Sequence, residues 1–275
     1  MRENLSVAAE YAIEHARKAL GDLSLAVLTG AGISTDSGIP DYRGQGKVAR
    51  HPMTFDVFMG SEQARIRYWA RSFVGWSRIA DAYPNAGHEA IALAEKQGRI
   101  AQVITQNVDQ LHQRAGSTRV IDLHGRLDMV RCMNCSSSLS RVEMDGLLQA
   151  SNPLIEKDAA IEFTPDGDAE IEVARDFVVP PCPKCGGILK PDVVFFGESV
   201  PVERVELCRA AVDDAEALLV VGTSLAVNSG FRFARQASKA NKPIVIVNVG
   251  ATKADELALT KIEANASLAL PLLLS

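Results

Sequence analysis

Four cysteines stand in two Cys-x-x-Cys pairs, Cys132/Cys135 and Cys182/Cys185. Each pair forms a short knuckle, and four thiolates around one ion leave no position open for a reactant. The spacing therefore predicts one structural zinc site that performs no chemistry itself. Two unrelated redox or buried pairs are the alternative, although disulfides are disfavoured in a chain without an export signal. The fifth cysteine, Cys208, is expected to be a buried apolar residue.

A glycine-rich loop follows an apolar run at residues 25–28. Gly30 and Gly32 allow a tight turn and a close approach of a ligand to the backbone. A helix that starts there would direct N–H groups and its dipole at a phosphate, although a plain tight turn is an equal alternative. The usual dinucleotide fingerprint is incomplete, because Thr35 stands where its third glycine is expected. Residues 47–51 offer basic side chains instead of the acid that a dehydrogenase needs, which favours a site that consumes its cofactor.

Polar side chains follow two other apolar runs. Asn107 and Asp109 come after residues 101–105, and a buried carboxylate can stabilise positive charge that develops in a transition state. His124 follows residues 120–123, and a histidine that titrates near neutral pH suits a general base. A helix cap for Asn107 and a hydrogen-bonded structural role for His124 are the alternatives.

Short apolar runs alternate with amphipathic segments along most of the chain. This alternation predicts an α/β fold, a Rossmann-like parallel sheet with helices on both faces and ligands at the carboxyl ends of the strands. The expected strands are residues 25–28, 101–105, 120–123, 217–221 and 244–248. The expected helices are residues 6–20, 86–97, 108–115, 202–215, 231–240 and 254–264.

Two stretches interrupt the alternation: residues 45–84, with an expected helix at 62–79, and the segment between the cysteine pairs. Long loops are uncommon unless they are functional or belong to a separate module. We therefore expect a smaller zinc-binding lobe with a helical insertion, made of residues 45–84 and 128–191. The large domain would comprise residues 1–44, 85–127 and 192–275.

Composition limits the class of protein. The 275 residues are 47% hydrophobic and 23% charged with a net charge of −5, which is typical of a globular protein with a sizeable core. Without a long basic run, direct nucleic-acid binding is not expected. No apolar stretch reaches the length of a membrane span, and the first residues lack a secretory signal, so we expect a cytoplasmic protein. The oligomeric state is not determined by the sequence.

Several motifs combine in one order: residues 29–43 (TGAGISTDSGIPDYR), 105–112 (TQNVDQLH), 123–125 (LHG), the cysteine pairs, 190–198 (KPDVVFFGE), 222–225 (GTSL) and 248–250 (NVG). With this order and spacing, nearly the whole chain resembles the sirtuins, the NAD-dependent protein-lysine deacylases. Residues 67–71, residues 165–168 and the long segment between the cysteine pairs resemble the class II branch that includes the mitochondrial lipoamidase-type sirtuin of animals.

The resemblance implies that NAD is bound and consumed as a co-substrate, and it also implies the zinc. Gly30, Ala31 and Gly32 would meet the pyrophosphate, and Ile39 would face Asn107 and Asp109 across the nicotinamide pocket. Asn248 would contact the adenosine ribose, and the alternative is that it caps the end of a strand. For Ser224, the alternative is a hydrogen-bonding role within its own loop. The other implied cofactor contacts are Asp41, Tyr42, Arg43, Gln106, Gly222, Thr223, Ser224, Gly250 and Ala266.

For the substrate, the resemblance implies that residues 193–198 pair with a peptide as an added strand, opposite residues 227–229. Apolar side chains of this segment would form the tunnel for the acyl-lysine stem, and a buried core strand is the alternative. His124 would draw a proton from a ribose hydroxyl after the acyl oxygen has attacked the sugar. The implied substrate contacts are Val194, Phe195, Phe196, Gly197, Glu198, Val227 and Asn228.

Tyr68 and Arg71 lie one helical turn apart and share a face of the expected helix. Sirtuins that remove carboxylated acyl groups use a Tyr-x-x-Arg pair at about this place, so Arg71 could bind a carboxylate through two parallel hydrogen bonds. A surface pair on the lobe is the alternative.

These features together predict an NAD-dependent deacylase that acts on acyl-lysine proteins and releases nicotinamide and an O-acyl-ADP-ribose. A protein mono-ADP-ribosyltransferase that uses the same site and a non-catalytic NAD or ADP-ribose sensor are the alternatives. The acyl group, the protein targets and the catalytic rate are not determined by the sequence.

Overall fold

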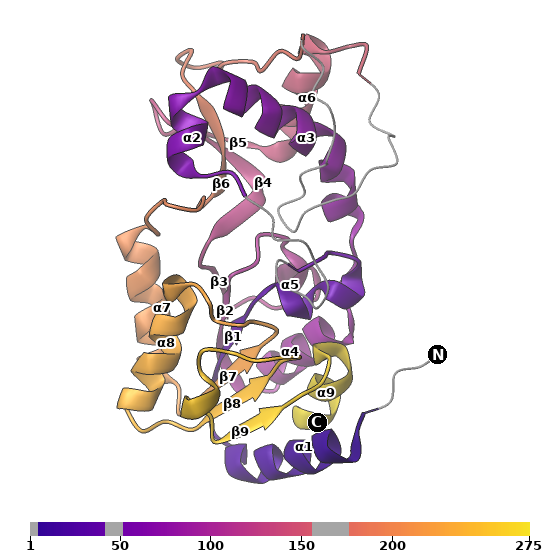
Figure 1. Ribbon diagram of the computed structural model, residues 1–275, viewed down its shortest axis with the longest axis vertical. Helices are drawn as coiled ribbons and strands as arrows, with labels where there is room; N and C mark the ends of the chain where they lie inside the picture. The colour runs from indigo at the N-terminus through magenta and orange to yellow at the C-terminus, as the bar shows by residue number, and fades with distance from the viewer. Residues whose placement is uncertain (1–4, 42–51, 156–175) are drawn as a thin grey trace.

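The computed structural model describes residues 5–41, 52–155 and 176–275 (Figure 1). A six-stranded parallel sheet lies at one end of the long axis in the order β3-β2-β1-β7-β8-β9. Its strands are β1 (Leu25–Thr29), β2 (Ile100–Thr105), β3 (Val120–Asp122), β7 (Ala217–Val221), β8 (Ile244–Val247) and β9 (Thr260–Ile262). The predicted Rossmann-like sheet is therefore confirmed.

Helices cover both faces of this sheet, because alternate residues of its strands pack on opposite sides. Val27 and Leu219 belong to one apolar cluster, with α1 (Val7–Leu20), α4 (Ala86–Lys96) and α9 (Ala266–Leu273). Leu28 and Val220 belong to the other, with α7 (Val202–Asp214) and α8 (Asn228–Lys239).

The first helix shows how local sequence sets its ends. The Ser6 hydroxyl accepts a hydrogen bond from the Ala9 N–H, and Gly21 ends the helix with a φ of 46°. The predicted helix at residues 6–20 is thus present, and the strand predictions fall within a residue or two of β1, β2, β3, β7 and β8.

Three helix predictions need correction. Residues 254–264 form a 3₁₀ turn (Asp255–Leu257) and the edge strand β9, because pairing with β8 outweighs their helical spacing. The helix expected at 108–115 shrinks to α5 (Leu111–Arg114), since Gln110 takes a φ of 63° and Asp109 accepts the Leu111 N–H. α8 begins at Asn228, three residues before the expected start at 231.

A smaller lobe lies at the other end of the molecule (Figure 1). Its antiparallel sheet has the order β5-β4-β6, and its apolar cluster includes Trp69, Phe73 and Met144. The sequence did not indicate this sheet, and the boundaries assigned to the two lobes stay a prediction. The lobe elements are α2 (Phe55–Gly60), α3 (Glu62–Asp81), β4 (Gly125–Cys132), β5 (Ser138–Ser140), α6 (Arg141–Ser151) and β6 (Leu189–Val193).

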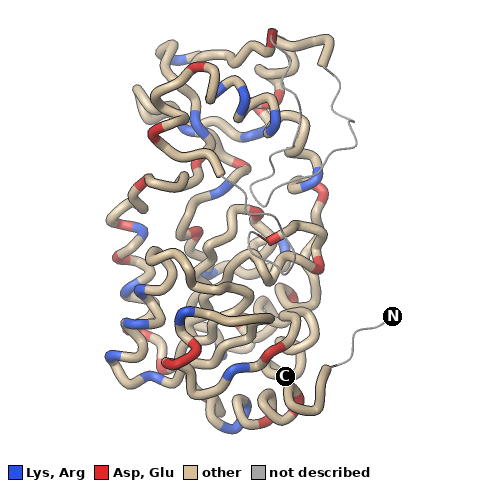
Figure 2. The backbone as a smooth tube through the Cα atoms, viewed as in Figure 1, with Lys and Arg blue, Asp and Glu red and all other residues tan. Residues whose placement is uncertain are grey.

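Acidic and basic residues are interspersed along the surface elements of both lobes (Figure 2). In the ranges that the structure describes, no helix combines the length and the apolar character that crossing a bilayer requires.

Candidate active site

A cavity of about 1250 Å³ opens at the carboxyl ends of the parallel strands and extends to the small lobe. The chain changes direction across the sheet between β1 and β7, and such a switch point is where open α/β sheets bind ligands. A typical pocket for one small molecule measures about 300–1,000 Å³. This cavity therefore has room for a dinucleotide and a second reactant.

The sequence-predicted cofactor and substrate residues mostly line this one cavity. Among the described residues the exceptions are Arg71, Asn228 and Ala266, and Asn228 is exposed while Ala266 is buried at the start of α9. Tyr42 and Arg43 lie outside the described residues.

Glycines let the loop after β1 pack directly on the loop after β7. A Cβ on Gly30 would lie 2.6 Å from the Thr223 Cβ, and one on Gly32 would lie 2.9 Å from the Gly222 Cα. Gly222 itself has a φ of +58°, and a Cβ there would lie 2.3 Å from the Ile33 nitrogen. The glycines thus allow the two loops to interlock, and the N–H groups of Gly30 and Gly32 donate to the carbonyls of Val221 and Gly222 over 3.0 and 2.8 Å.

Ser34 connects the two polar residues of the loop after β2. Its hydroxyl donates to Oδ2 of Asp109 over 2.8 Å and accepts from Nδ2 of Asn107 over 3.1 Å. The Asn107 amide also donates to the Gly30 carbonyl over 3.2 Å. Asn107 therefore does not cap a helix in this structure. No sequence pattern indicated the role of Ser34, because its partners lie more than 70 residues away.

Asp109 is buried, and burial raises the pKa of its carboxyl group. Hydrogen bonds from the Leu111 N–H and the Ser34 hydroxyl favour the carboxylate and partly oppose this rise in pKa. The carboxylate is thus buried and hydrogen-bonded at the wall of the cavity, which buried Ile39 also lines. A positive charge that develops in this pocket would be stabilised strongly.

His124 follows β3 and lines the same cavity. Its Nδ1 lies 3.1 Å from the Gln106 carbonyl, which can only accept, so Nδ1 carries the proton. Nε2 is then the basic nitrogen, and it lies 2.8 Å from the Ser229 hydroxyl. Burial lowers the pKa of His124, the bond to Gln106 raises it, and the charge of Arg204 lowers it. The imidazole is therefore neutral at pH 7 and able to accept a proton.

The predicted substrate segment runs beside His124. The Val194 N–H donates to the His124 carbonyl over 2.8 Å, and Phe196 pairs with Thr54 in a parallel bridge. The Glu198 carboxylate accepts from the Phe195 N–H over 2.8 Å and lies 3.0 Å from Nζ of buried Lys190. This ion pair fixes the turn of the segment.

Tyr68 and Phe195 form part of an aromatic wall of the cavity. Their ring centres lie 5.3 Å apart, and each ring also contacts Phe58 in an edge arrangement. Arg71 lies one turn further along α3, and its buried Nε has no hydrogen-bond partner in the described part of the chain.

Asn248 and Gly250 line the end of the cavity beyond β8. The Asn248 side chain donates to the carbonyls of Val249 and Gly250 over 2.9 and 3.0 Å, which leaves its Oδ1 available to accept. Gln106 donates to the Thr29 carbonyl and the Thr223 hydroxyl, and so joins the loops after β1, β2 and β7.

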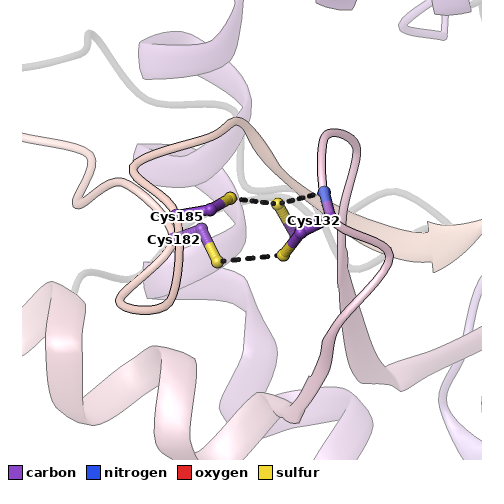
Figure 3. Close-up of side chains that lie close together, drawn as sticks. Cys132, Cys182 and Cys185 are labelled. Atoms are coloured by element: carbon purple, nitrogen blue, oxygen red, sulfur yellow. Dashed lines mark hydrogen bonds between the residues drawn. The ribbon is translucent and has the colours of Figure 1, made fainter.

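The four predicted metal-binding cysteines meet in the small lobe. Pairing of β4 with β6 brings the two knuckles together, and Cys132 faces Cys182 and Cys185 across the gap (Figure 3). The Sγ atoms of Cys132 and Cys185 lie 3.5 Å apart, and those of Cys135 and Cys182 lie 3.9 Å apart. Sulfurs about 2.3 Å from a tetrahedral zinc ion lie about 3.8 Å from one another. The four thiols are thus positioned to hold zinc, as predicted.

Comparison with known proteins agrees with this geometry. Residues 30–229 match the Sir2 family. An NAD-dependent protein deacetylase of Xanthomonas campestris pv. campestris (strain 8004) is 55% identical over 253 residues, which cover 90% of this chain and 86% of the relative. An NAD-dependent protein deacetylase of Bordetella bronchiseptica (strain ATCC BAA-588 / NCTC 13252 / RB50) is 52% identical over 249 residues, which cover 88% of this chain and 89% of the relative.

Solved structures are similar over almost the whole chain. A Sir2 enzyme superposes with a TM-score of 0.76 at 32% identity, covering 96% of this chain and 97% of the other. A Sir2 protein with a p53 peptide and NAD⁺ superposes with a TM-score of 0.75 at 29% identity, covering 93% of this chain and 94% of the other.

Interlocked glycine loops at the switch point of a parallel sheet define a dinucleotide-binding α/β protein, here with an added zinc lobe. More particularly, the chain belongs to the Sir2 family and is an NAD-dependent sirtuin.

Proposed function

We propose that this sirtuin removes acyl groups from lysine side chains of proteins and transfers them to ADP-ribose, with release of nicotinamide from NAD. The observation that carries the proposal is the basic Nε2 of His124, which lies in one cavity with the glycine loops and the segment at residues 193–198. The names of the relatives, NAD-dependent protein deacetylases, support it.

On the cofactor side, Asn107 and Asp109 would hold the nicotinamide carboxamide while Ile39 closes the pocket. NAD supplies the ribose that receives the acyl group. The buried Asp109 carboxylate would stabilise the positive charge that develops as the glycosidic bond breaks, and its Ser34 partner would keep it ionised and oriented.

On the substrate side, the peptide would add a strand between residues 194–197 and 227–229, which places the lysine stem along Phe195 and Tyr68. Nε2 of His124 would then exchange its contact with Ser229 for the ribose hydroxyl and take that proton. The hydroxyl so activated accepts the acyl group. Gln106 keeps the imidazole in the required tautomer throughout.

The preferred acyl class is a finer part of the proposal. Residues 67–71 support a place in the class II, lipoamidase-type branch, and the unpartnered Nε of Arg71 within the described residues supports a carboxylated acyl group. We also propose a cytoplasmic location, since four reduced thiols around zinc suit a reducing compartment.

An assay with NAD and a panel of peptides carrying acetyl-, succinyl-, glutaryl-, hydroxymethylglutaryl- or lipoyl-lysine tests the function. We expect nicotinamide release that depends on one class of acyl peptide, and its loss in His124→Tyr. Nicotinamide release without deacylation, with ADP-ribose attached to a protein, would instead establish a mono-ADP-ribosyltransferase. Binding of NAD or ADP-ribose with no turnover would establish a sensor.

A further inference from the structure

Asp122 is a half-buried carboxylate at the end of β3 that the proposed mechanism does not use. It is not among the residues that line the cavity, so it can affect a reaction there only through its neighbours. Two side-chain amides donate to it. Nε2 of Gln110 lies 3.2 Å from Oδ1, and Nε2 of Gln113 lies 3.0 Å from Oδ1 and 3.2 Å from Oδ2. A carboxylate has enough acceptor sites for all of these contacts.

Gln110 has a backbone conformation that needs support. Its φ of 63° and ψ of 18° are left-handed, which is unfavourable for a residue that has a Cβ. The next N–H along the chain, that of Leu111, donates to Oδ1 of Asp109 over 2.9 Å. Because Ser34 donates to Oδ2, the two oxygens of Asp109 are held from different directions. One of these two bonds therefore depends on the left-handed turn at Gln110.

Three contacts join the loop after β2 to the segment that runs from β3 into β4, at every second residue of the loop. In chain order they are Gln106 to His124 (3.1 Å), Val108 to Leu127 (3.0 Å) and Gln110 to Asp122 (3.2 Å). The residues between them, Asn107 and Asp109, bond to Ser34 instead. The first two contacts use backbone carbonyls of the loop, whereas the third uses the Gln110 side chain. A substitution in the loop can therefore remove the third contact alone.

We propose that Asp122 is a positioning residue for the proposed deacylation. It holds the Gln110 amide, keeps Gln110 left-handed and thereby keeps the Leu111 N–H on the carboxylate of Asp109. The inference rests on the proposed function, in which Asp109 stabilises the positive charge that develops as the bond to nicotinamide breaks. Asp122 would touch neither NAD nor the peptide and would still set the geometry of that step.

Two substitutions at position 110 separate support of the turn from side-chain packing. Gln110→Met keeps the length of the side chain and the Cβ but has no amide, so its left-handed turn is unsupported. Gln110→Gly also lacks the amide, but glycine adopts this turn without support. A left-handed residue with a Cβ is disfavoured about 5- to 30-fold.

We therefore expect Gln110→Met to lower kcat at least about 5-fold, with the KM of the acyl peptide changed by less than about twofold. Gln110→Gly should keep a kcat within about twofold of the parent value. Equal impairment of the two variants, or a parent-like kcat in Gln110→Met, would overturn the proposal.

Gln113→Met is the matched control, because it removes the other amide from Asp122 and leaves the contact with Gln110. We expect its kcat to be close to that of the parent. A loss as large as that in Gln110→Met would show that Asp122 only packs α5 against β3, which would contradict a positioning role.

A double-mutant cycle tests whether Asp122 acts through Gln110. Asp122→Ala should lower kcat at least about 5-fold in the parent and clearly less in the Gln110→Gly protein, where the turn needs no support. The contact with Gln113 is lost in both backgrounds, so its effect cancels in the comparison. Equal effects of Asp122→Ala in the two backgrounds would refute the link.

Hydrogen exchange of the Leu111 amide, followed by NMR on ¹⁵N-labelled protein, tests the chain of contacts without an activity assay. Exchange should be at least about 5-fold faster in Asp122→Ala and Gln110→Met, and parent-like in Gln110→Gly and Gln113→Met. Unchanged exchange in Asp122→Ala would overturn the positioning role whether or not the protein proves to be a deacylase. Absence of deacylation in the parent would count against the proposed function alone, and the exchange rates would still decide the role of Asp122.

Discussion

The hydroxyl of Ser34 donates a 2.8 Å hydrogen bond to Oδ2 of Asp109, and this contact joins the loop after β1 to the loop after β2. The bond links a candidate cofactor loop to the carboxylate that would meet positive charge. The cofactor cradle and the reacting centre are therefore one connected structure, and changes in either should affect both.

Ser34→Ala tests this connection. The Ser34 bond lowers the pKa of Asp109 against the rise caused by burial, so its loss raises that pKa further. Because the carboxylate is the required form, activity is lost as pH falls through this pKa, and the acid limb of the pH–rate profile should move to higher pH. We expect kcat/KM for NAD to fall about 10-fold at pH 7. Ser77→Ala, at an exposed position of α3, is the control. An unmoved acid limb would count against the role of Ser34.

Gly222→Ala tests the interlock of the glycine loops. A Cβ there meets the Ile33 nitrogen at 2.3 Å, and the φ of +58° is strained for alanine. We expect a loss of at least about 3 kcal/mol in the free energy of unfolding, measured with urea, and weaker NAD binding. Gly146→Ala, in an exposed helix interior with open space around it, should instead stabilise by about 0.5–1 kcal/mol. A stable Gly222→Ala variant with normal NAD affinity would disprove the interlock.

Removal of zinc should unfold the small lobe and abolish activity indirectly. The four thiols join a knuckle at the end of β4 to a knuckle before β6, and β4 pairs with β6 in the sheet of this lobe. Elemental analysis should find one zinc per chain, and Cys182→Ser should lose it together with the near-ultraviolet circular dichroism of the lobe. Cys208→Ala, at the buried cysteine outside the cluster, should keep its zinc. A folded, fully active metal-free protein would rule out a structural role.

The buried histidines predict a loss of stability in mild acid. Burial lowers the pKa of His88 to about 4 and that of His112 well below 6.5, whereas both titrate near 6.5 in an unfolded chain. Below pH 6.5 the unfolded chain therefore binds protons that the folded chain does not, which costs about 1.4 kcal/mol per pH unit for each histidine. The contribution of both histidines is constant above pH 6.5 and falls as the pH drops below that value, for His88 down to about pH 4. In urea unfolding between pH 7.5 and 4.5, the free energy of unfolding of His88→Asn should depend less steeply on pH than that of the parent, and His15→Asn, at an exposed residue, is the comparison variant. Identical slopes for His88→Asn and the parent would contradict this account.

Arg71→Met tests the acyl preference. A bidentate bond to a carboxylate should contribute about 2–3 kcal/mol, so succinyl and glutaryl activities should fall about 30- to 150-fold while acetyl activity stays within a few-fold. Arg67→Met, four residues earlier on an exposed position of α3, is the matched control. If succinyl and glutaryl activities are untouched in Arg71→Met, the carboxylate hypothesis is wrong.

Most of the parallel sheet and the zinc site could be predicted because their signals are local. Runs such as residues 217–221 are apolar throughout, as a strand covered on both faces must be, and each Cys-x-x-Cys pair specifies its own knuckle. β9 could not be predicted, because its three residues become a strand only through pairing with β8. The antiparallel sheet of the small lobe likewise depends on pairing between β4 and β6, which are separated by more than 50 residues.

The sequence by itself determined the chemical inventory of this protein: four thiols, glycine loops after strands, and a histidine, an amide and a carboxylate near strand ends. The tertiary structure decided how these groups are coupled. Only sheet order brings Ser34 to Asp109, Gly222 to Ile33 and His88 to His112. Spacing patterns describe one turn or one strand, whereas these contacts depend on the relative placement of elements that lie far apart along the chain.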